Sequence, residues 1–379
     1  MTALPPIVDQ QTWRAQLDEL RKREKAATRE LDAIAAQRRR LPMVQLPDYT
    51  LVGADGPVSL AEVFDGRSQL IVYNHMWTDG EEWQCPGCTG FTSQFTRLEF
   101  LDNYDARFVI VTNGPIAEAL AYKAKVGNKM DWYSSADSSF GADVDAETWQ
   151  RELDALRVRE KAATRELDAI AAQRRRLPMV KMPDYILEGE EGPVRLADVF
   201  NGASQLIVYS HMWFPGEEWQ CPGCTGFTAQ YTRLEFLEDY DARFVIVTQG
   251  PIDEALDYKR RVGNKMTWYS TANSPFGSDV GAPPGGGFAV NVFLRDGDTV
   301  YRTWHTNGRG TEQLTHTFPL IDILPYGRME AWQDSPEGWP KEPTYSRWGT
   351  SQDVAKAYGP GAKLSRGYFA RQPPSTTSV

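Results

Sequence analysis

The chain has 379 residues, which is too long for one small domain and suits two. Its 51 acidic residues outnumber its 41 basic residues, and this excess argues against a nucleic-acid partner, which needs a basic face for phosphates. Hydrophobic residues make up 41%, as in globular chains that bury a core. No stretch approaches the roughly 18 apolar residues of a membrane span, and the first residues lack a secretory signal pattern. We therefore expect a cytoplasmic protein with no membrane partner.

The sequence repeats itself with an offset of 136 residues. Cys85 recurs as Cys221, and residues 12–144 (copy one) align with residues 148–280 (copy two) without a gap. A period of this length indicates a duplicated domain and not a solenoid.

The two copies continue differently. Copy one runs directly into copy two, whereas copy two is followed by about a hundred further residues. We expect a truncated module over 8–144, a complete module over 145–328, and a C-terminal extension over 329–379 whose end is flexible.

The hydrophobic pattern predicts alternating helices and strands. Apolar residues at a three-to-four spacing indicate long amphipathic helices over 12–40 and 148–176. The further elements expected in copy two are strand 206–209, helix 227–237, strand 243–248, helix 252–262, a hairpin of strands 288–295 and 299–304, and helix 312–324. This order predicts an α/β fold of two tandem thioredoxin-like modules, each with a long N-terminal helix, the first lacking the C-terminal hairpin.

The missing hairpin leaves an unpaired edge in the first sheet. Folded proteins cover or pair such edges because bare edges aggregate. We expect the cover to be the connection at 137–148, the C-terminal region 329–370, or a second chain. The last of these alternatives would make the protein a homo-oligomer.

Each copy carries Cys-Pro-Gly-Cys between a predicted buried strand and a predicted helix. This position is typical of a redox dithiol. Cys221 would be the N-cap and Pro222 the first helical residue, so the helix dipole and free amides would stabilise a Cys221 thiolate. Cys224, one turn later, would resolve a mixed disulfide. Cys85 and Cys88 would take the same roles in copy one.

Two histidines are candidates for the same site. His211 ends the strand that precedes the motif, at the sheet edge where α/β proteins bind ligands. His305 ends the second hairpin strand, and folding the hairpin about Gly297 places it opposite Ala289. Cys221, Cys224, His211 and His305 would then converge, and such a set is a competent site for copper or zinc. Ordinary hydrogen-bonding roles at strand ends remain the alternative for both histidines.

Two further residues are candidates for substrate binding. Arg309, in the sequence His-Thr-Asn-Gly-Arg-Gly, either binds an anionic substrate or caps a loop. Trp219 stands two residues before the first cysteine of copy two.

These motifs together resemble a known family. The segments that carry the resemblance are Arg174-Arg175-Arg176-Leu177-Pro178, Leu206-Ile207-Val208-Tyr209-Ser210-His211-Met212, Cys221-Pro222-Gly223-Cys224 and Phe293-Leu294-Arg295-Asp296-Gly297. The chain is similar to the bacterial proteins of domain-of-unknown-function family 899, often described as dithiol–disulfide oxidoreductases. The resemblance implies a thioredoxin-like fold and a redox role. The chain departs from the family pattern in being a tandem whose first copy lacks the hairpin and its histidine.

Three functions follow from these observations. The leading hypothesis is a thiol–disulfide oxidoreductase that acts on a small-molecule or thiol/disulfide substrate and requires no cofactor. The alternative is a copper- or zinc-dependent enzyme or metal-binding protein that uses the Cys/Cys/His/His set, which has a fold-level analogy in copper-delivery proteins. The third is a non-catalytic scaffold. Thiol reactivity separates them, since a dithiol reacts with thiol reagents whereas a metal site resists until it is chelated.

Overall fold

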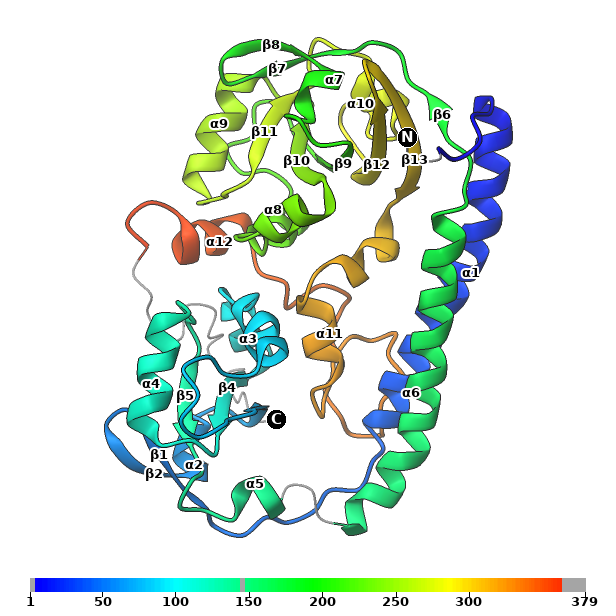
Figure 1. Cartoon of the computed structure of the whole chain (residues 1–379). Helices are drawn as coiled ribbons and strands as arrows, with labels where there is room; N and C mark the ends of the chain where they lie inside the picture. Colours follow the sequence, from blue (N-terminus) through cyan, green and yellow to red (C-terminus); the bar gives the residue numbers. More distant parts are fainter. Residues whose placement is uncertain (1–3, 144–146, 363–379) are drawn as a thin grey trace, which may run out of the picture. The chain divides into compact units, whose positions relative to one another are not determined.

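The computed structural model describes residues 4–143 and 147–362, which form two compact units (Figure 1). The eight-stranded unit consists of Met1–Asp32, Lys161–His316 and Trp348–Leu364. The described residues of the five-stranded unit lie in Ala33–Glu160 and Thr317–Arg347. These boundaries differ from the expected modules, because each unit takes segments from both sides of the repeat boundary. The expected flexible end lies outside the described residues.

The five-stranded unit contains the sheet of copy one. Its strands are β1 (Thr50–Gly53), β2 (Gly56–Ser59), β3 (Gln69–His75), β4 (Ala106–Thr112) and β5 (Asp131–Ser134), in the order β2-β1-β5-β4-β3. Strands β3, β4 and β5 are parallel. The helices wholly within the unit are α2 (Leu60–Val63), α3 (Pro86–Ser93), η1 (Glu99–Tyr104), α4 (Ile116–Lys125), α5 (Phe140–Asp143) and α11 (Thr317–Asp322).

The eight-stranded unit contains the sheet of copy two. Its strands are β6 (Val180–Lys181), β7 (Ile186–Gly189), β8 (Gly192–Arg195), β9 (Gln205–His211), β10 (Ala242–Thr248), β11 (Thr267–Ser270), β12 (Ala289–Asp296) and β13 (Thr299–Thr306). Their order is β6-β13-β12-β9-β10-β11-β7-β8. The helices wholly within the unit are α7 (Leu196–Val199), α8 (Pro222–Ala229), η2 (Glu235–Tyr240), α9 (Ile252–Arg261), α10 (Phe276–Asp279), η3 (Gly308–Leu314) and α12 (Ser351–Tyr358).

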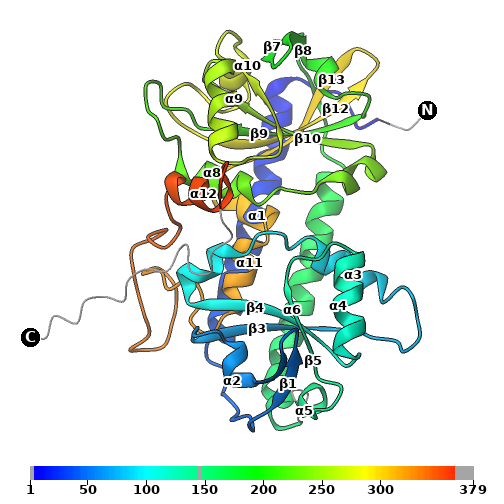
Figure 2. The same ribbon diagram turned by 90° about the vertical axis from the view of Figure 1, so that its left-hand side faces the viewer.

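The predicted mixed α/β class is confirmed, with local differences. The predicted hairpin forms as β12 and β13, which lie side by side next to β9 (Figures 1 and 2). The helix expected over 227–237 is instead a shorter helix, α8, that starts at the motif, followed by η2. The last expected helix, 312–324, is divided into η3 and α11. The short strands β5 and β11 were not expected.

The two long helices form close to where the sequence predicts them, as α1 (Gln10–Arg38) and α6 (Glu147–Arg174). In the eight-stranded unit, α1 buries Trp13, Leu17 and Leu20 in the core that contains the sheet of copy two. The amphipathic stripe of α1 is thus buried partly against the other copy's sheet. No helix among the described residues has the length and apolar character needed to span a membrane.

Strand β3 is the edge of its sheet, whereas its equivalent β9 is central and pairs with β12. Within the described ranges, no strand pairs with the outer side of β3, so the described parts of 137–148 and 329–370 do not cover this edge as a strand. Residues after the hairpin nevertheless join this unit's core, namely Leu320, Ile321 and Leu324.

Candidate functional site

Both Cys-Pro-Gly-Cys motifs form the start of a helix, as the sequence predicts. Cys221 is the N-cap of α8, and its Sγ accepts a hydrogen bond from the backbone N–H of Cys224 at 3.4 Å. Cys85 caps α3 in the same way, with the N–H of Cys88 also 3.4 Å away. Proline follows each N-cap, where its missing N–H costs no helical hydrogen bond. The motif alone therefore builds the same local geometry twice.

A buried glutamine holds the loop that leads into each motif. The Gln220 side chain accepts from the N–H of Phe214 at 2.6 Å and donates to the carbonyl oxygens of Phe214 and Glu217. Gln84 makes the equivalent contacts with Thr78 and Glu81. These contacts fix the loop that places the first cysteine of each motif, a role that we did not predict for either glutamine.

The two cysteines of copy two have opposite electrostatic environments. The pKa of Cys221 is lowered to about 6, chiefly by a hydrogen bond from the Cys224 side chain, with further help from the amides of Cys224 and Gly223. Burial raises the pKa of the Cys224 thiol, and the neighbouring Cys221 raises it further. Cys224 is 1% exposed, whereas Cys221 is half-buried. One sulfur is therefore an accessible thiolate, and the other is a protonated thiol held beneath it.

Tyr209 lies beside the inner sulfur. Its hydroxyl is hydrogen-bonded to Cys224, and its ring stacks on Phe227 with centroids 4.9 Å apart. Burial raises the pKa of Tyr209 well above its ordinary value, so the hydroxyl keeps its proton. Tyr209 shares its sheet face with His211, since the two are separated by one residue of the same strand. This alternation could have identified Tyr209 as a site residue from the sequence.

His211 reaches the motif through Thr225. Its Nδ1 lies 2.9 Å from the Met212 carbonyl oxygen, which only accepts, so Nδ1 carries the proton of the neutral ring. Burial lowers the pKa of His211 to about 4. Its Nε2 is 3.5 Å from the Thr225 hydroxyl, which donates to the Cys221 carbonyl oxygen at 2.9 Å. His211 is therefore a neutral residue whose Nε2 lies next to Thr225, the residue that bonds to the Cys221 carbonyl oxygen.

His305 does not join the cysteines. In the register, His305 is opposite Asn291, not Ala289, and Asn291 is opposite Val208. Directly paired residues share a face, and Val208 faces away from Tyr209 and His211 because side chains alternate along a strand. His305 Nδ1 accordingly contacts Asn291 Oδ1 at 3.1 Å on the opposite face of the sheet.

The expected four-residue convergence is therefore not formed. Among the residues that the structure describes, no three or more His, Cys, Asp or Glu side chains are grouped so that they could hold a metal ion.

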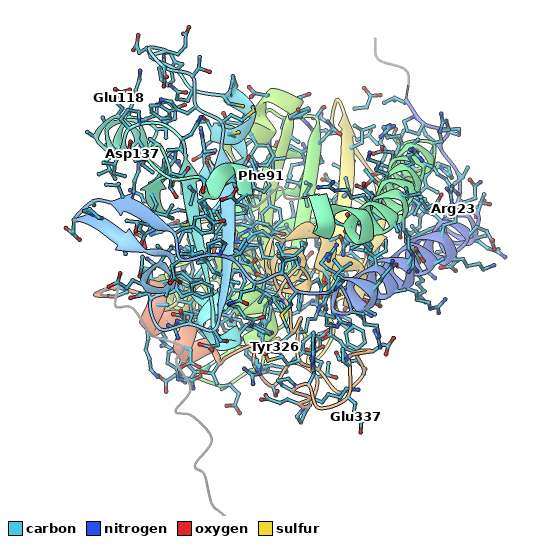
Figure 3. All side chains as sticks on the ribbon, turned by 90° about the horizontal axis from the view of Figure 1, so that it is seen from below. Arg23, Phe91, Glu118, Asp137, Tyr326 and Glu337 are labelled. Atoms are coloured by element: carbon cyan, nitrogen blue, oxygen red, sulfur yellow. The ribbon has the colours of Figure 1, made fainter. Side chains whose placement is uncertain are left out.

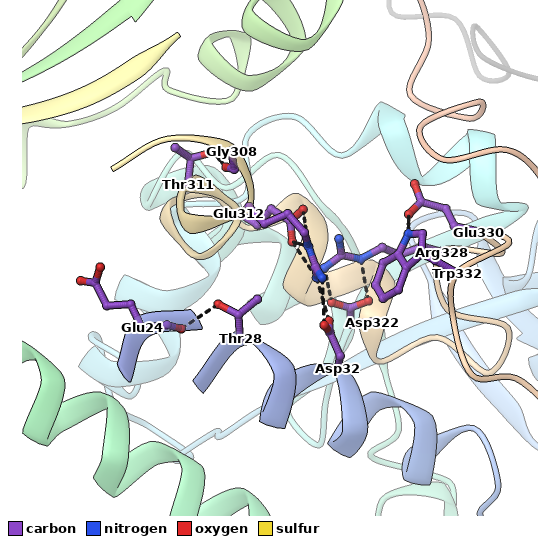
Figure 4. Close-up of polar contacts among 11 residues, drawn as sticks. Glu24, Thr28, Asp32, Gly308, Thr311, Glu312, Asp322, Arg328, Glu330 and Trp332 are labelled. Atoms are coloured by element: carbon purple, nitrogen blue, oxygen red, sulfur yellow. Dashed lines mark hydrogen bonds and ion pairs between the residues drawn. The ribbon is translucent and has the colours of Figure 1, made fainter. Parts of the chain in front are cut away.

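Arg309 and Trp219 have other partners. The Arg309 guanidinium is held by Asp32 at 2.7 and 2.9 Å and by Glu312 at 3.2 Å; Asp32 and Glu312 are labelled in Figure 4. These ion pairs fix the loop after β13, which borders a cavity of about 400 Å³. The Trp219 ring lies beneath Arg261, whose guanidinium carbon is 5.4 Å from the ring centroid.

A segment near the C-terminus contacts the second motif and was not predicted from the sequence. We call Trp348–Gly361 the strap; it contains α12, and Figures 1 and 2 both show α12 beside α8. Trp348 Nε1 donates to the Pro222 carbonyl oxygen at 3.3 Å, and Ser351 Oγ donates to the Gln220 carbonyl oxygen at 2.6 Å. The strap therefore lies directly against the start of the dithiol helix.

The fold and the site define a mixed α/β protein with a dithiol at a helix N-terminus in each of two units. A model of the family described as "Bacterial protein of unknown function (DUF899)" matches residues 2–148 and 144–353. The chain belongs to this family, and the two matched segments are consistent with a tandem duplication. No curated protein sequence matches the chain.

A solved structure from Chlorobium tepidum, of a protein proposed to be the thiol:disulfide interchange protein DsbE, is 18% identical to this chain. That match covers 38% of this chain and 95% of the other, with a TM-score of 0.26.

Proposed function

We propose that this protein is a thiol–disulfide oxidoreductase built from thioredoxin-like modules. The observation that carries the proposal is the pairing of an accessible Cys221, whose pKa is lowered to about 6, with a buried Cys224 whose pKa is raised. At pH 7 a thiol with a pKa of about 6 is roughly 90% thiolate, whereas an ordinary thiol is only a few per cent thiolate. A non-catalytic scaffold does not require such a difference between the pKa values of the two thiols.

The reaction proceeds in two exchanges. The Cys221 thiolate attacks one sulfur of a substrate disulfide, forms a mixed disulfide and releases the other substrate sulfur as a thiolate. Cys224 then loses its proton and attacks the Cys221 sulfur, which releases the second substrate thiolate. The two cysteines are oxidised to a disulfide, and the substrate disulfide is reduced to two thiols. An external dithiol such as dithiothreitol returns the pair to the reduced form.

Two neighbouring residues are placed so that they stabilise the second thiolate and hold the helix N-cap. The Tyr209 hydroxyl lies on Cys224 and stabilises the thiolate that forms there in the second exchange. Thr225, through its bond to the Cys221 carbonyl oxygen, keeps the N-cap in place. In copy one, Tyr73 is hydrogen-bonded to Cys88 in the same manner, and the pKa of Cys85 is also lowered.

Trapping of the mixed disulfide tests the proposal. In a chain that carries Cys85→Ser and Cys88→Ser, we expect Cys224→Ser to accumulate a mixed disulfide with glutathione disulfide at Cys221, detected by intact mass. Cys221→Ser should form none. Equal amounts of glutathione adduct on Cys221 and Cys224, or adduct formation in both variants, would count against Cys221 as the attacking sulfur.

A further inference from the structure

The two dithiol helices have the same motif but different surroundings. More residues of α8 than of α3 are buried. Phe227 is 5% exposed, whereas its equivalent Phe91, which is labelled in Figure 3, is 44% exposed. The strap contacts α8 within the eight-stranded unit.

The Trp348 ring lies on the first turns of α8. A Cβ atom added at Gly226 would be 2.8 Å from Trp348 Nε1 and 3.1 Å from its Cε2. The ring therefore occupies the surface beside Pro222 that a bulky partner would need in order to approach Cys221. At the equivalent position on α3, a Cβ atom added at Gly90 would meet nothing within 4 Å.

The far end of the strap is also fixed. A Cβ atom added at Gly263 would be 1.7 Å from the Tyr358 carbonyl oxygen, so the strap packs onto backbone at this point. At the equivalent Gly127, an added Cβ atom would meet nothing within 4 Å. Between the two ends, Ser351 and Val354 are buried. The strap is thus anchored at several points over the second dithiol, and the described part of the first dithiol helix has no such cover at these positions.

We propose that the strap restricts Cys221 to small disulfides and thiols, while Cys85 remains accessible to disulfides of folded proteins. This inference rests on the proposed function and adds the substrate class of each dithiol. Cys221 is half-buried, as Cys85 is, so we expect a small molecule to reach its sulfur without moving Trp348. A folded protein must first displace the ring, which breaks the bond to Pro222.

Alkylation by small and large reagents tests the strap independently of redox chemistry. One chain keeps only the second dithiol (Cys85→Ser, Cys88→Ser), and the other keeps only the first (Cys221→Ser, Cys224→Ser). The measured quantity is the ratio of the rate with iodoacetamide to the rate with a long-chain polyethylene glycol maleimide. We expect this ratio to be about tenfold higher for the second dithiol, which is the effect of one or two hydrogen bonds that hold the strap closed.

Two substitutions alter the strap without touching the sulfurs. Gly226→Ala pushes the Trp348 ring aside, and Trp348→Ala removes it, so both should lower the ratio toward that of the first dithiol. Gly90→Ala, the matched control, should leave the first dithiol unchanged. Circular dichroism establishes that each variant is folded, and Trp348→Ala provides the test if Gly226→Ala is not. Equal ratios for the two dithiols, or a ratio that Trp348→Ala does not change, would overturn the proposal.

Disulfide exchange identifies the substrate class. With glutathione disulfide both dithiols should react, whereas with insulin the first dithiol should react markedly faster than the second. If neither dithiol exchanges with glutathione disulfide although both alkylate, the proposed oxidoreductase function fails while the alkylation ratios still decide on the strap. If insulin reacts equally with both dithiols, the size selection is refuted.

Discussion

The lowered pKa of Cys221 should depend on the Cys224 side chain. The Cys224 thiol is the largest cause of the shift to about 6, and the backbone amides of Cys224 and Gly223 contribute as well. The substitution Cys224→Ala removes the thiol and leaves both amides in place. The pKa of Cys221 should therefore rise, yet remain below the value of an ordinary thiol.

The size of the change follows from the bond that is lost. A hydrogen bond to a charged group contributes about 1.5–3 kcal/mol, and a thiol is a weak donor, so the lower end applies. Because one pKa unit corresponds to 1.36 kcal/mol, the expected rise is about one unit, which moves the Cys221 pKa from about 6 to about 7. Cys224→Ser is the matched control, since its hydroxyl keeps a donor at nearly the same place.

The assay is the rate of iodoacetamide alkylation as a function of pH in the Cys85→Ser, Cys88→Ser background. The midpoint of the profile is more informative than the rate at neutral pH. A lower pKa increases the thiolate fraction but also reduces its nucleophilicity, with a Brønsted slope of about 0.4–0.5, so the two effects largely cancel at pH 7. The reasoning is refuted if Cys224→Ala leaves the midpoint near 6, or if Cys224→Ser shifts it as far as Cys224→Ala does.

Three further predictions concern stability and are measured by urea unfolding. The pKa of His211 is about 4 in the folded chain against an ordinary value of 6.5, so the unfolded chain binds a proton first, and stability falls as pH decreases from 6.5 to 4. His211→Gln should remove about 2 kcal/mol of the difference between pH 7 and pH 5. Arg309→Ala should destabilise the fold by about 2 kcal/mol, discounted for partial exposure, because Asp32 and the buried Glu312 each lose an ion pair. Unchanged stability with weaker substrate binding would favour the substrate-binding role instead. Met179→Ala should cost about 2–5 kcal/mol because Met179 is fully buried, whereas Met43→Ala, at the equivalent and 91% exposed position, should change stability by less than about 0.5 kcal/mol.

The predictable parts of this protein are those with strong local signals. Proline directly after Cys221 fixes the start of α8, because proline is favoured at the first helical position. Long apolar runs identify β9 and β10, which pair in parallel in the middle of the sheet. The turn around Gly297, where φ is +56°, identifies the hairpin.

Features that depend on distant contacts were missed. The face of His305 depends on the pairing of three strands, and an irregularity between Val292 and Phe293 shifts the register by one residue. Strand β11 has four residues, too few for a clear alternation. Trp348 contacts Pro222 across 126 positions of sequence, and nothing in the local sequence indicates such a contact.

The composition of the units also could not be deduced from the repeat. Helices α1 and α6 have nearly the same sequence, so the apolar stripe of either helix fits the sheet of either copy. In the eight-stranded unit, Trp13 of α1 donates through Nε1 to the Thr303 carbonyl oxygen on β13, a strand that copy one lacks. The presence of β13 therefore creates a binding position for one of two similar helices. Which of the two helices occupies this position is decided only in the folded chain.

The duplication separates what a motif determines from what its surroundings determine. The N-cap bond is 3.4 Å in both copies, so the short motif alone is enough to place a cysteine sulfur at the start of a helix. Exposure differs because β12, β13 and the strap lie beside the second motif only, within the described residues. A solvent-exposed dithiol can exchange with partners of any size, whereas a segment packed over a dithiol limits the size of the partner that can reach it. On our proposal, unequal additions to two equal copies allow one chain to hold two dithiols of the same chemistry and different selectivity.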